Sequence, residues 1–419
     1  MTVATRRERS LGHPRNVRIV TRLLSRRLLP LGLIFLASGM ASAVVLPFLG
    51  LFLSSAIHAG PVQVSAFMII ASLSSVAMAH GIARLSDRRP MRRTLLITAA
   101  LAGFVSTGLT AVVRDYWILL ALTVTATAVA GTLYPQSFAY AREALTRDDP
   151  DRAAMGISTL RTVFSVAWVG GPLVAAVVLD KTDFRYVYGT AAVFYLSAAL
   201  IAVRWLPEIE APATPPSDEH ENARPPRGIY RIIAGFVLLT TTMVLGVQAM
   251  SLYVSTDLGG SVGDSGLILG LCAALEIPLM LGFGALSTRI PVRRLVLVGA
   301  VCAMAYQALA ATAQSVWMLA AAQVLNALFI AATSGLGISY VQDLMPLQPG
   351  RATTLFTNTF PLGQILTAPL FGLAQEYGYR LAYVMNLILA ALGLLLLVTA
   401  RPSARPAGKR LPEINAKNP

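Results

Sequence analysis

The chain of 419 residues is too apolar for a water-soluble domain of its size, because 55% of its residues are hydrophobic, 13% are charged and its mean hydropathy is +0.65. Its net charge of +14 at pH 7 would also suit a protein that binds nucleic acid. However, the basic residues are dispersed among short segments and no nucleic-acid-binding motif accompanies them. Composition therefore predicts a protein embedded in a lipid bilayer and argues against a nucleic-acid partner.

Twelve apolar segments follow one another along the chain. Each is close to the roughly 20 residues that an α-helix needs to cross a bilayer. A membrane β-barrel would instead show alternating segments of about ten residues, and we find no such pattern in the sequence. We predict an all-α membrane protein of twelve transmembrane helices at 28–53, 62–83, 94–113, 116–139, 154–179, 186–206, 231–256, 264–287, 295–312, 317–341, 353–376 and 381–400.

Basic residues are concentrated on one side of these predicted spans. Of the 34 Lys and Arg residues, 29 fall in the two ends of the chain, in every second loop or at a span end that borders such a loop, and Arg161 lies well inside a span. The other side carries four: Arg114, Lys181, Arg185 and Arg380. The positive-inside rule then predicts a multi-pass protein of the cytoplasmic (inner) membrane with both termini in the cytoplasm.

The second half of the chain repeats the first. The stretch "GIARLSDRRPMRRTLLI" at 81–97 recurs 201 residues later as "GFGALSTRIPVRRLVLV", which aligns Arg92 with Arg293. Two repeated six-helix halves around a site at the bilayer midplane are typical of secondary transporters. A proline-rich and acidic segment separates the halves and predicts a solvated linker. The expected divisions are a basic arm (1–27), an N-terminal half (28–206), a linker (207–230), a C-terminal half (231–400) and a tail (401–419).

The repeated stretch resembles the loop 2/3 signature of the major facilitator superfamily, with Pro90 in place of the second glycine and the first glycine displaced to Gly81. The string "AWVGGPLVAA" at 167–176 is similar to the span 5 motif of its exporters. The strings "LRTVFSVAWVGGPL", "LCAALEIPLM", "QVLNALFIAATSGLGISYVQDLMP" and "RATTLFTNTFPLGQIL" resemble bacterial sugar efflux transporters. This resemblance implies the major facilitator fold and export, driven by the proton-motive force, of small sugars such as lactose, glucose and thiogalactosides, or of related glycosides.

Two ionisable residues lie well inside predicted spans, Arg161 in the fifth and Glu276 in the eighth. A charged side chain at the bilayer centre costs roughly 3 kcal/mol unless it faces a partner or a water-filled cavity. The superfamily resemblance implies that these two spans line the same seam between the halves. We therefore predict that Arg161 binds substrate and that Glu276 carries the coupling proton. A purely structural ion pair is the competing interpretation.

Polar and aromatic side chains in the same strings complete the predicted sugar site. Trp168 follows Arg161 by seven residues and so lies on the same helical face. Sugars require planar or bidentate hydrogen-bonding groups, which Asn326, Asn358 and Gln364 supply within spans. Amides that only hold neighbouring helices together remain the alternative for these three residues.

The basic stretch at 81–97 is predicted to act as a conformational latch. Asp87 would approach the positive N-terminus of the eleventh span and Arg142, and Arg88 and Arg92 would surround it. Such contacts would hold the halves together at the cytoplasmic face while the cavity opens outward. A solvated loop without a gating role is the alternative interpretation.

Taken together, these features predict a monomeric sugar exporter that works by alternating access, with sugar, protons and lipid as its partners. The chain has no G-x-x-x-x-G-K-[ST] loop for ATP, and we expect no cofactor, no metal and no enzymatic activity. Cys272 and Cys302 both fall in apolar spans and are interpreted as packing residues. A drug or amphiphile exporter on the same fold is the first alternative, and a membrane receptor or membrane-embedded enzyme is the second.

Overall fold

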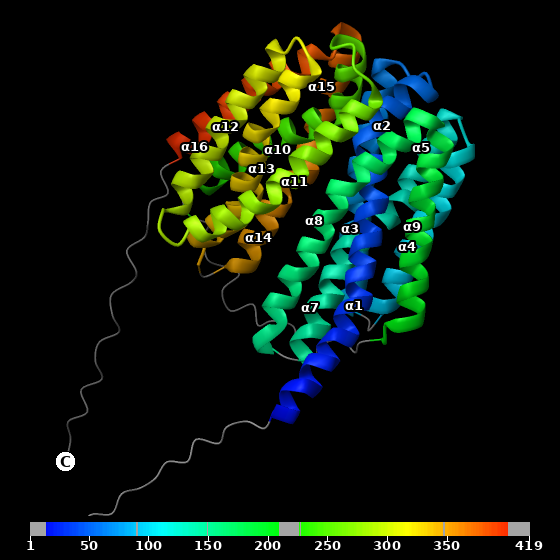
Figure 1. The fold of residues 1–419 in the computed structure, drawn as a ribbon, viewed down its shortest axis with the longest axis vertical. Helices are drawn as coiled ribbons and strands as arrows, with labels where there is room; N and C mark the ends of the chain where they lie inside the picture. The colour runs from blue at the N-terminus through cyan, green and yellow to red at the C-terminus, as the bar shows by residue number, and fades with distance from the viewer. Residues whose placement is uncertain are drawn as a thin grey trace, which may run out of the picture.

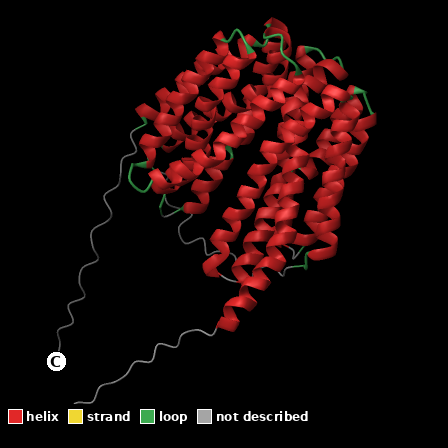
Figure 2. Cartoon of the chain, in the orientation of Figure 1, coloured by secondary structure: helices red, strands yellow, loops and turns green. Residues whose placement is uncertain are grey.

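A computed structural model describes residues 14–88, 91–148, 150–208, 226, 228–346 and 348–400. Within these ranges the backbone is almost entirely helical and contains no strand, as Figure 2 shows. Eleven of the described segments are long and apolar enough to cross a membrane. The prediction of an all-α membrane protein is therefore confirmed.

The N-terminal half contains six long helical segments, several of which change pitch along their length. The first helix begins fourteen residues before the predicted span. The elements are α1 (Pro14–Val45), η1 (Leu46–Phe48), α2 (Leu49–Leu51), η2 (Phe52–Ala56), α3 (Pro61–Arg88), α4 (Arg92–Val112), α5 (Tyr116–Leu122), η3 (Thr123–Thr127), α6 (Ala128–Ala130), α7 (Leu133–Asp148), α8 (Pro150–Lys181) and α9 (Phe184–Trp205).

The C-terminal half repeats this order, with one visible break. The predicted span at 353–376 is divided at Asn358 into two helices. The elements are α10 (Ile229–Leu252), η4 (Tyr253–Asp257), α11 (Val262–Leu286), α12 (Val292–Thr312), α13 (Val316–Leu344), α14 (Pro349–Thr357), α15 (Thr359–Tyr377) and α16 (Arg380–Thr399).

Equivalent arginines fasten corresponding helix ends in the two halves. The Arg93 guanidinium donates to the carbonyls of residues 202 and 203 at the end of α9, the shorter contact being 2.6 Å. Arg293 donates in the same way to the carbonyls of residues 397, 398 and 400 at the end of α16. The sequence repeat aligns Arg293 with Arg92. In the structure, however, the contacts equivalent to those of Arg293 are made by Arg93. Helices α4 and α12 start 200 residues apart, which explains the one-residue difference.

The two halves share a hydrophobic core at one end of the bundle only. We call the end that carries the loops after α3 and α11 the basic end. At the opposite end a single cluster joins Phe52 and Phe67 of the N-terminal half to Leu245, Tyr253 and Phe371 of the C-terminal half. Towards the basic end each half has a core of its own. Figure 1 shows the helices of the two halves meeting at the top and diverging towards the bottom.

Close packing seals the opposite end. Gly266 of α11 lies against α8, where a Cβ atom would come within 2.7 Å of the Pro172 carbonyl oxygen and would overlap Ala176. On the other side of the seam α15 packs against α3, and the Gln375 side-chain amide donates to the Ala59 carbonyl at 2.9 Å. The structure thus describes a state that is closed at the opposite end and separated at the basic end.

Candidate functional site

One face of α8 carries the predicted substrate-binding residues of the N-terminal half. Arg161, Phe164 and Trp168 follow each other at helical spacings of three and four residues, which aligns them in one stripe. Arg161 is exposed and Trp168 is half-buried. Because α8 packs against α11 of the other half, this stripe borders the seam between the halves.

Glu276 faces this stripe from α11. Near the opposite end Gly266 lies against Ala176 and Gly270 against Leu173, and the antiparallel continuation brings Glu276 to within about one and a half helical turns of the level of Arg161, a distance that an extended arginine side chain can bridge. The two charges interact across the seam. Among the side chains that the structure describes, Arg161 and Glu276 make no direct ion pair or hydrogen bond with each other. The two side chains therefore influence each other across the seam without forming an ion pair in this state.

Tyr134 is a site residue that the sequence analysis missed. It is the second residue of α7 and its hydroxyl interacts electrostatically with the Arg161 guanidinium. Its ring lies 4.0 Å, centroid to centroid, from the Phe164 ring and 4.8 Å from the Phe138 ring. The spacing of tyrosines along the chain gives no hint of this, since the contact depends on how α7 packs against α8.

Asn326 of α13 contacts α11 one helical turn away from Glu276. It is buried on α13, where its side-chain NH₂ group donates to Gln323 Oε1 at 2.9 Å and to Cys272 Sγ at 3.4 Å. Gln323 in turn donates to the Tyr306 hydroxyl at 3.2 Å. Cys272 is one turn from Glu276 on α11. The NH₂ group of Asn326 is thus engaged with α11 and with its own helix.

Asn358 and Gln364 lie apart from these contacts. Asn358 is exposed at the junction of α14 and α15, and Gln364 is half-buried on α15. No contact of either side chain with Arg161 or Glu276 is found in the described part of the chain. Their role in binding stays a prediction.

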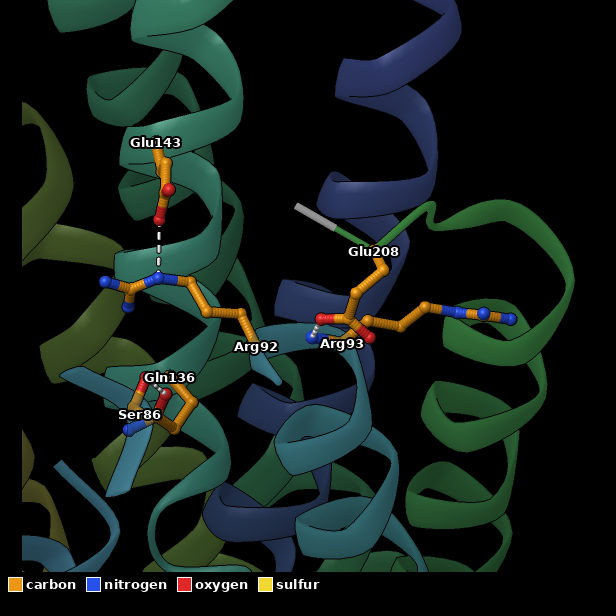
Figure 3. A network of polar contacts seen from close by, with 6 residues as sticks. All are labelled: Ser86, Arg92, Arg93, Gln136, Glu143 and Glu208. Carbon is orange, nitrogen blue, oxygen red and sulfur yellow. Dashed lines mark hydrogen bonds and ion pairs between the residues drawn. The ribbon is translucent and has the colours of Figure 1, made fainter. Parts of the chain in front are cut away.

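The basic end holds a polar network, drawn in Figure 3. Arg92 of α4 forms an ion pair with Glu143 of α7, and the Ser86 hydroxyl donates to Gln136 Oε1 at 3.3 Å. Both contacts stay within the N-terminal half, so Arg92 does not reach the other half in this state.

The other predicted latch residues are less constrained by the structure. Arg142 is exposed on α7. Asp87 and Arg88 end α3, and their side chains lie outside the described residues. The latch therefore stays a prediction.

Comparison with known proteins identifies the family. The model of the Major Facilitator Superfamily matches residues 31–253 and 232–418. Sugar efflux transporter A of Dickeya chrysanthemi is 33% identical over 84% of this chain and 90% of its own length. The chain belongs to the sugar efflux transporter family of the major facilitator superfamily. Proteins of this family are transporters and not enzymes.

Other sugar efflux transporters match over similar lengths. A Deinococcus radiodurans protein, provisionally named a sugar efflux transporter, is 36% identical over 89% of this chain and 98% of its own. Sugar efflux transporter C of Escherichia coli is 32% identical over 82% of this chain and 88% of its own.

Solved structures share the fold of this sugar efflux transporter family member at much lower identity. The nucleoside transporter NupG superimposes with a TM-score of 0.73 at 12% identity, covering 88% of this chain and 97% of that one. A bacterial homologue of the human lysosomal transporter Spinster gives a TM-score of 0.72 at 15% identity over 90% and 96%. These two likenesses concern the fold alone.

Proposed function

We propose that this protein exports small sugars or glycosides from the cytoplasm by alternating access, in exchange for protons. The observation that carries the proposal is the Arg161–Glu276 pair, which faces across the seam between the halves without direct contact. Similarity to named sugar efflux transporters supports sugar as the substrate class. The 29-to-4 distribution of basic residues supports a cytoplasmic basic end.

The pair supplies complementary chemistry for a polyhydroxylated ligand. The Arg161 guanidinium offers only donors in a planar fork, and an ionised Glu276 offers only acceptors. A sugar hydroxyl both donates and accepts, so one sugar can bridge the two side chains. A protonated Glu276 loses its charge and half of its acceptor character. Proton uptake by Glu276 therefore weakens its contact with the sugar without abolishing it, and this linkage is the requirement for exchange.

The described state fits one stage of this cycle. With the halves separated at the basic end, Arg161 is exposed and a sugar reaches it from the cytoplasm. Export then requires the shared cluster at the opposite end to separate and the basic end to close, with the Asp87 latch formed in the second state. The bound sugar would leave on the far side as Glu276 takes up a proton.

Transport into inside-out vesicles tests the proposal. Labelled glucose, lactose and a cationic dye are supplied with and without an imposed proton gradient. We expect accumulation of sugar that an uncoupler abolishes. Accumulation of the dye alone would favour the drug or amphiphile exporter, and sugar accumulation that is insensitive to the uncoupler would refute proton exchange.

Glu276→Gln separates coupling from binding. Glutamine resembles the protonated carboxyl group in shape and charge, so we expect no gradient-driven accumulation but continued exchange of sugar between preloaded vesicles and medium. Glu376→Gln, at an exposed carboxylate on α15, is the matched control and should behave as wild type. If Glu276→Gln still accumulates sugar against its gradient, Glu276 does not carry the proton.

A further inference from the structure

A tyrosine of the N-terminal half is fixed in place next to Arg161. Three aromatic side chains hold the Tyr134 ring: Phe164 at 4.0 Å, Phe138 at 4.8 Å and Phe35 at 6.2 Å between centroids. They come from α8, α7 and α1, so three helical segments define the orientation of the ring. The ring therefore needs no rearrangement to present its hydroxyl.

The hydroxyl of Tyr134 and Glu276 approach Arg161 from different halves. The guanidinium interacts electrostatically with both, although Tyr134 belongs to α7 and Glu276 to α11. Arg161 itself is exposed while Tyr134 is half-buried. The charge of the guanidinium thus acts on a fixed hydroxyl of its own half and on a carboxyl group of the other half.

The hydrogen-bonding capacity of the three groups differs in a way that selects a ligand. Arginine can only donate, an ionised carboxylate can only accept, and a phenol does both. Of the three groups, only the phenol can accept a hydrogen from one sugar hydroxyl while donating to a second. A ligand with hydroxyl groups on adjacent carbons satisfies Tyr134 and Arg161 together, whereas an apolar amphiphile leaves both without partners. Groups built to bond a hydroxyl reject ligands that lack it.

We propose that Tyr134 is a specificity-determining residue, whose hydroxyl acts with the Arg161 guanidinium to hold two neighbouring hydroxyl groups of one sugar ring. This inference rests on the proposed function, because it assigns the substrate contacts of the same site. It places the diol contact entirely in the N-terminal half. Sugar recognition and proton exchange are thereby divided between the halves, and Glu276 can change its charge without loss of the contacts that select the sugar.

Binding measured through Trp168 tests the inference. The chain has four tryptophans. The other three, Trp117, Trp205 and Trp317, are at least 53% exposed and are replaced by phenylalanine. Glucose and its 2-, 3-, 4- and 6-deoxy derivatives are titrated against this background and against the same protein with Tyr134→Phe.

Tyr134→Phe should weaken binding of glucose about tenfold, the effect of losing one hydrogen bond to substrate. One deoxy derivative should bind the background and Tyr134→Phe equally, since the missing sugar hydroxyl is the one that Tyr134 contacts. Tyr195→Phe removes the hydroxyl of a half-buried tyrosine that interacts with Ser42 instead and should change neither affinity nor the deoxy pattern.

The failures are distinguishable. If the background protein binds glucose and Tyr134→Phe binds all five sugars with the affinities of the background, Tyr134 is a packing residue and the inference is overturned while the proposed function stands. If binding falls by the same factor for every derivative, the hydroxyl acts on site structure and not on one sugar hydroxyl, which also overturns it. If neither protein binds any of the sugars, the proposed function itself fails.

Discussion

A single methyl group at Gly266 should shift the balance between the two states of the proposed transport cycle. Gly266 is buried where α11 crosses α8, and a Cβ there would lie 2.7 Å from the Pro172 carbonyl oxygen, against the 3.4 Å at which ordinary van der Waals contact begins. The Pro172 carbonyl oxygen is a backbone atom, so rotation of a side chain cannot relieve the overlap. The closed opposite end must therefore open by a few tenths of an ångström or more to admit alanine.

The size of the effect follows from the cost of overpacking. An extra methyl group in a well-packed interface costs about 1–3 kcal/mol, and the cost falls only on the state in which α8 and α11 are closed at this end. The equilibrium should move about 5- to 150-fold towards the state that is open at the opposite end. Alanine has a higher helix propensity than glycine by about 1 kcal/mol. The effect of Gly266→Ala is therefore compared with that of a second Gly→Ala substitution on the same helix, which gains the same propensity.

Spin labels at the basic end report the shift. Met155 of α8 and Leu281 of α11 are each 72% exposed, and cysteines placed there, with Cys272 and Cys302 replaced by alanine, carry the labels. Double electron–electron resonance should show shorter separations in Gly266→Ala.

The matched control is Gly282→Ala. A Cβ atom there would have no other atom within 4 Å, so the distances should match those of the parent. If Gly266→Ala leaves the distances unchanged, or lengthens them, the contact at Pro172 does not belong to one state only.

Three further substitutions probe the site and both ends of the seam. Arg161→Lys keeps the charge but loses the planar fork, so sugar affinity should fall about tenfold in normally inserted protein; wild-type affinity would make Arg161 a structural cation. Asp87→Asn should slow transport yet leave affinity from the cytoplasmic side equal or higher, and lost binding with unchanged label distances would contradict the latch. Gln375→Met removes the hydrogen bond to the Ala59 carbonyl. The ratio of the two states should therefore change about fivefold, and the label distances should change in the same direction as in Gly266→Ala. Glu376→Gln, at the next residue, should leave the distances unchanged.

The positions of the helices could be predicted from sequence because a bilayer imposes length and apolarity on every crossing segment. The break at Asn358 could not. There Thr357 donates its hydroxyl to the Thr354 carbonyl at 3.2 Å, and Thr359 donates to the Phe356 carbonyl at 2.7 Å. Hydroxyl groups that bond to preceding carbonyls compete with the helix ladder. A window average of hydropathy does not register three consecutive polar residues inside an apolar segment.

Residues of the candidate site could be predicted from sequence only where burying the side chain in the membrane carries a large free-energy cost. Arg161 and Glu276 stand out because a charge inside a span requires an explanation. Tyr134 carries no such signal, since tyrosine is common in cores. The partner of Arg92 was equally hidden, because Glu143 comes from another helix, 51 positions along the chain. Contacts between helices depend on packing, which one sequence does not encode in its local pattern.

The arginines that fasten helix ends act at two different times. During insertion into the membrane, before any tertiary contact exists, Arg93 and Arg293 count as positive charges that retain their loops on one side. Once the helices are packed, the same guanidinium groups bond to the carbonyls that end α9 and α16. Lysine would serve the first purpose as well as arginine, but its single ammonium group cannot span several carbonyls at once. The use of arginine at these two positions therefore reflects the finished fold, while their charge alone suffices for the orientation of the nascent chain.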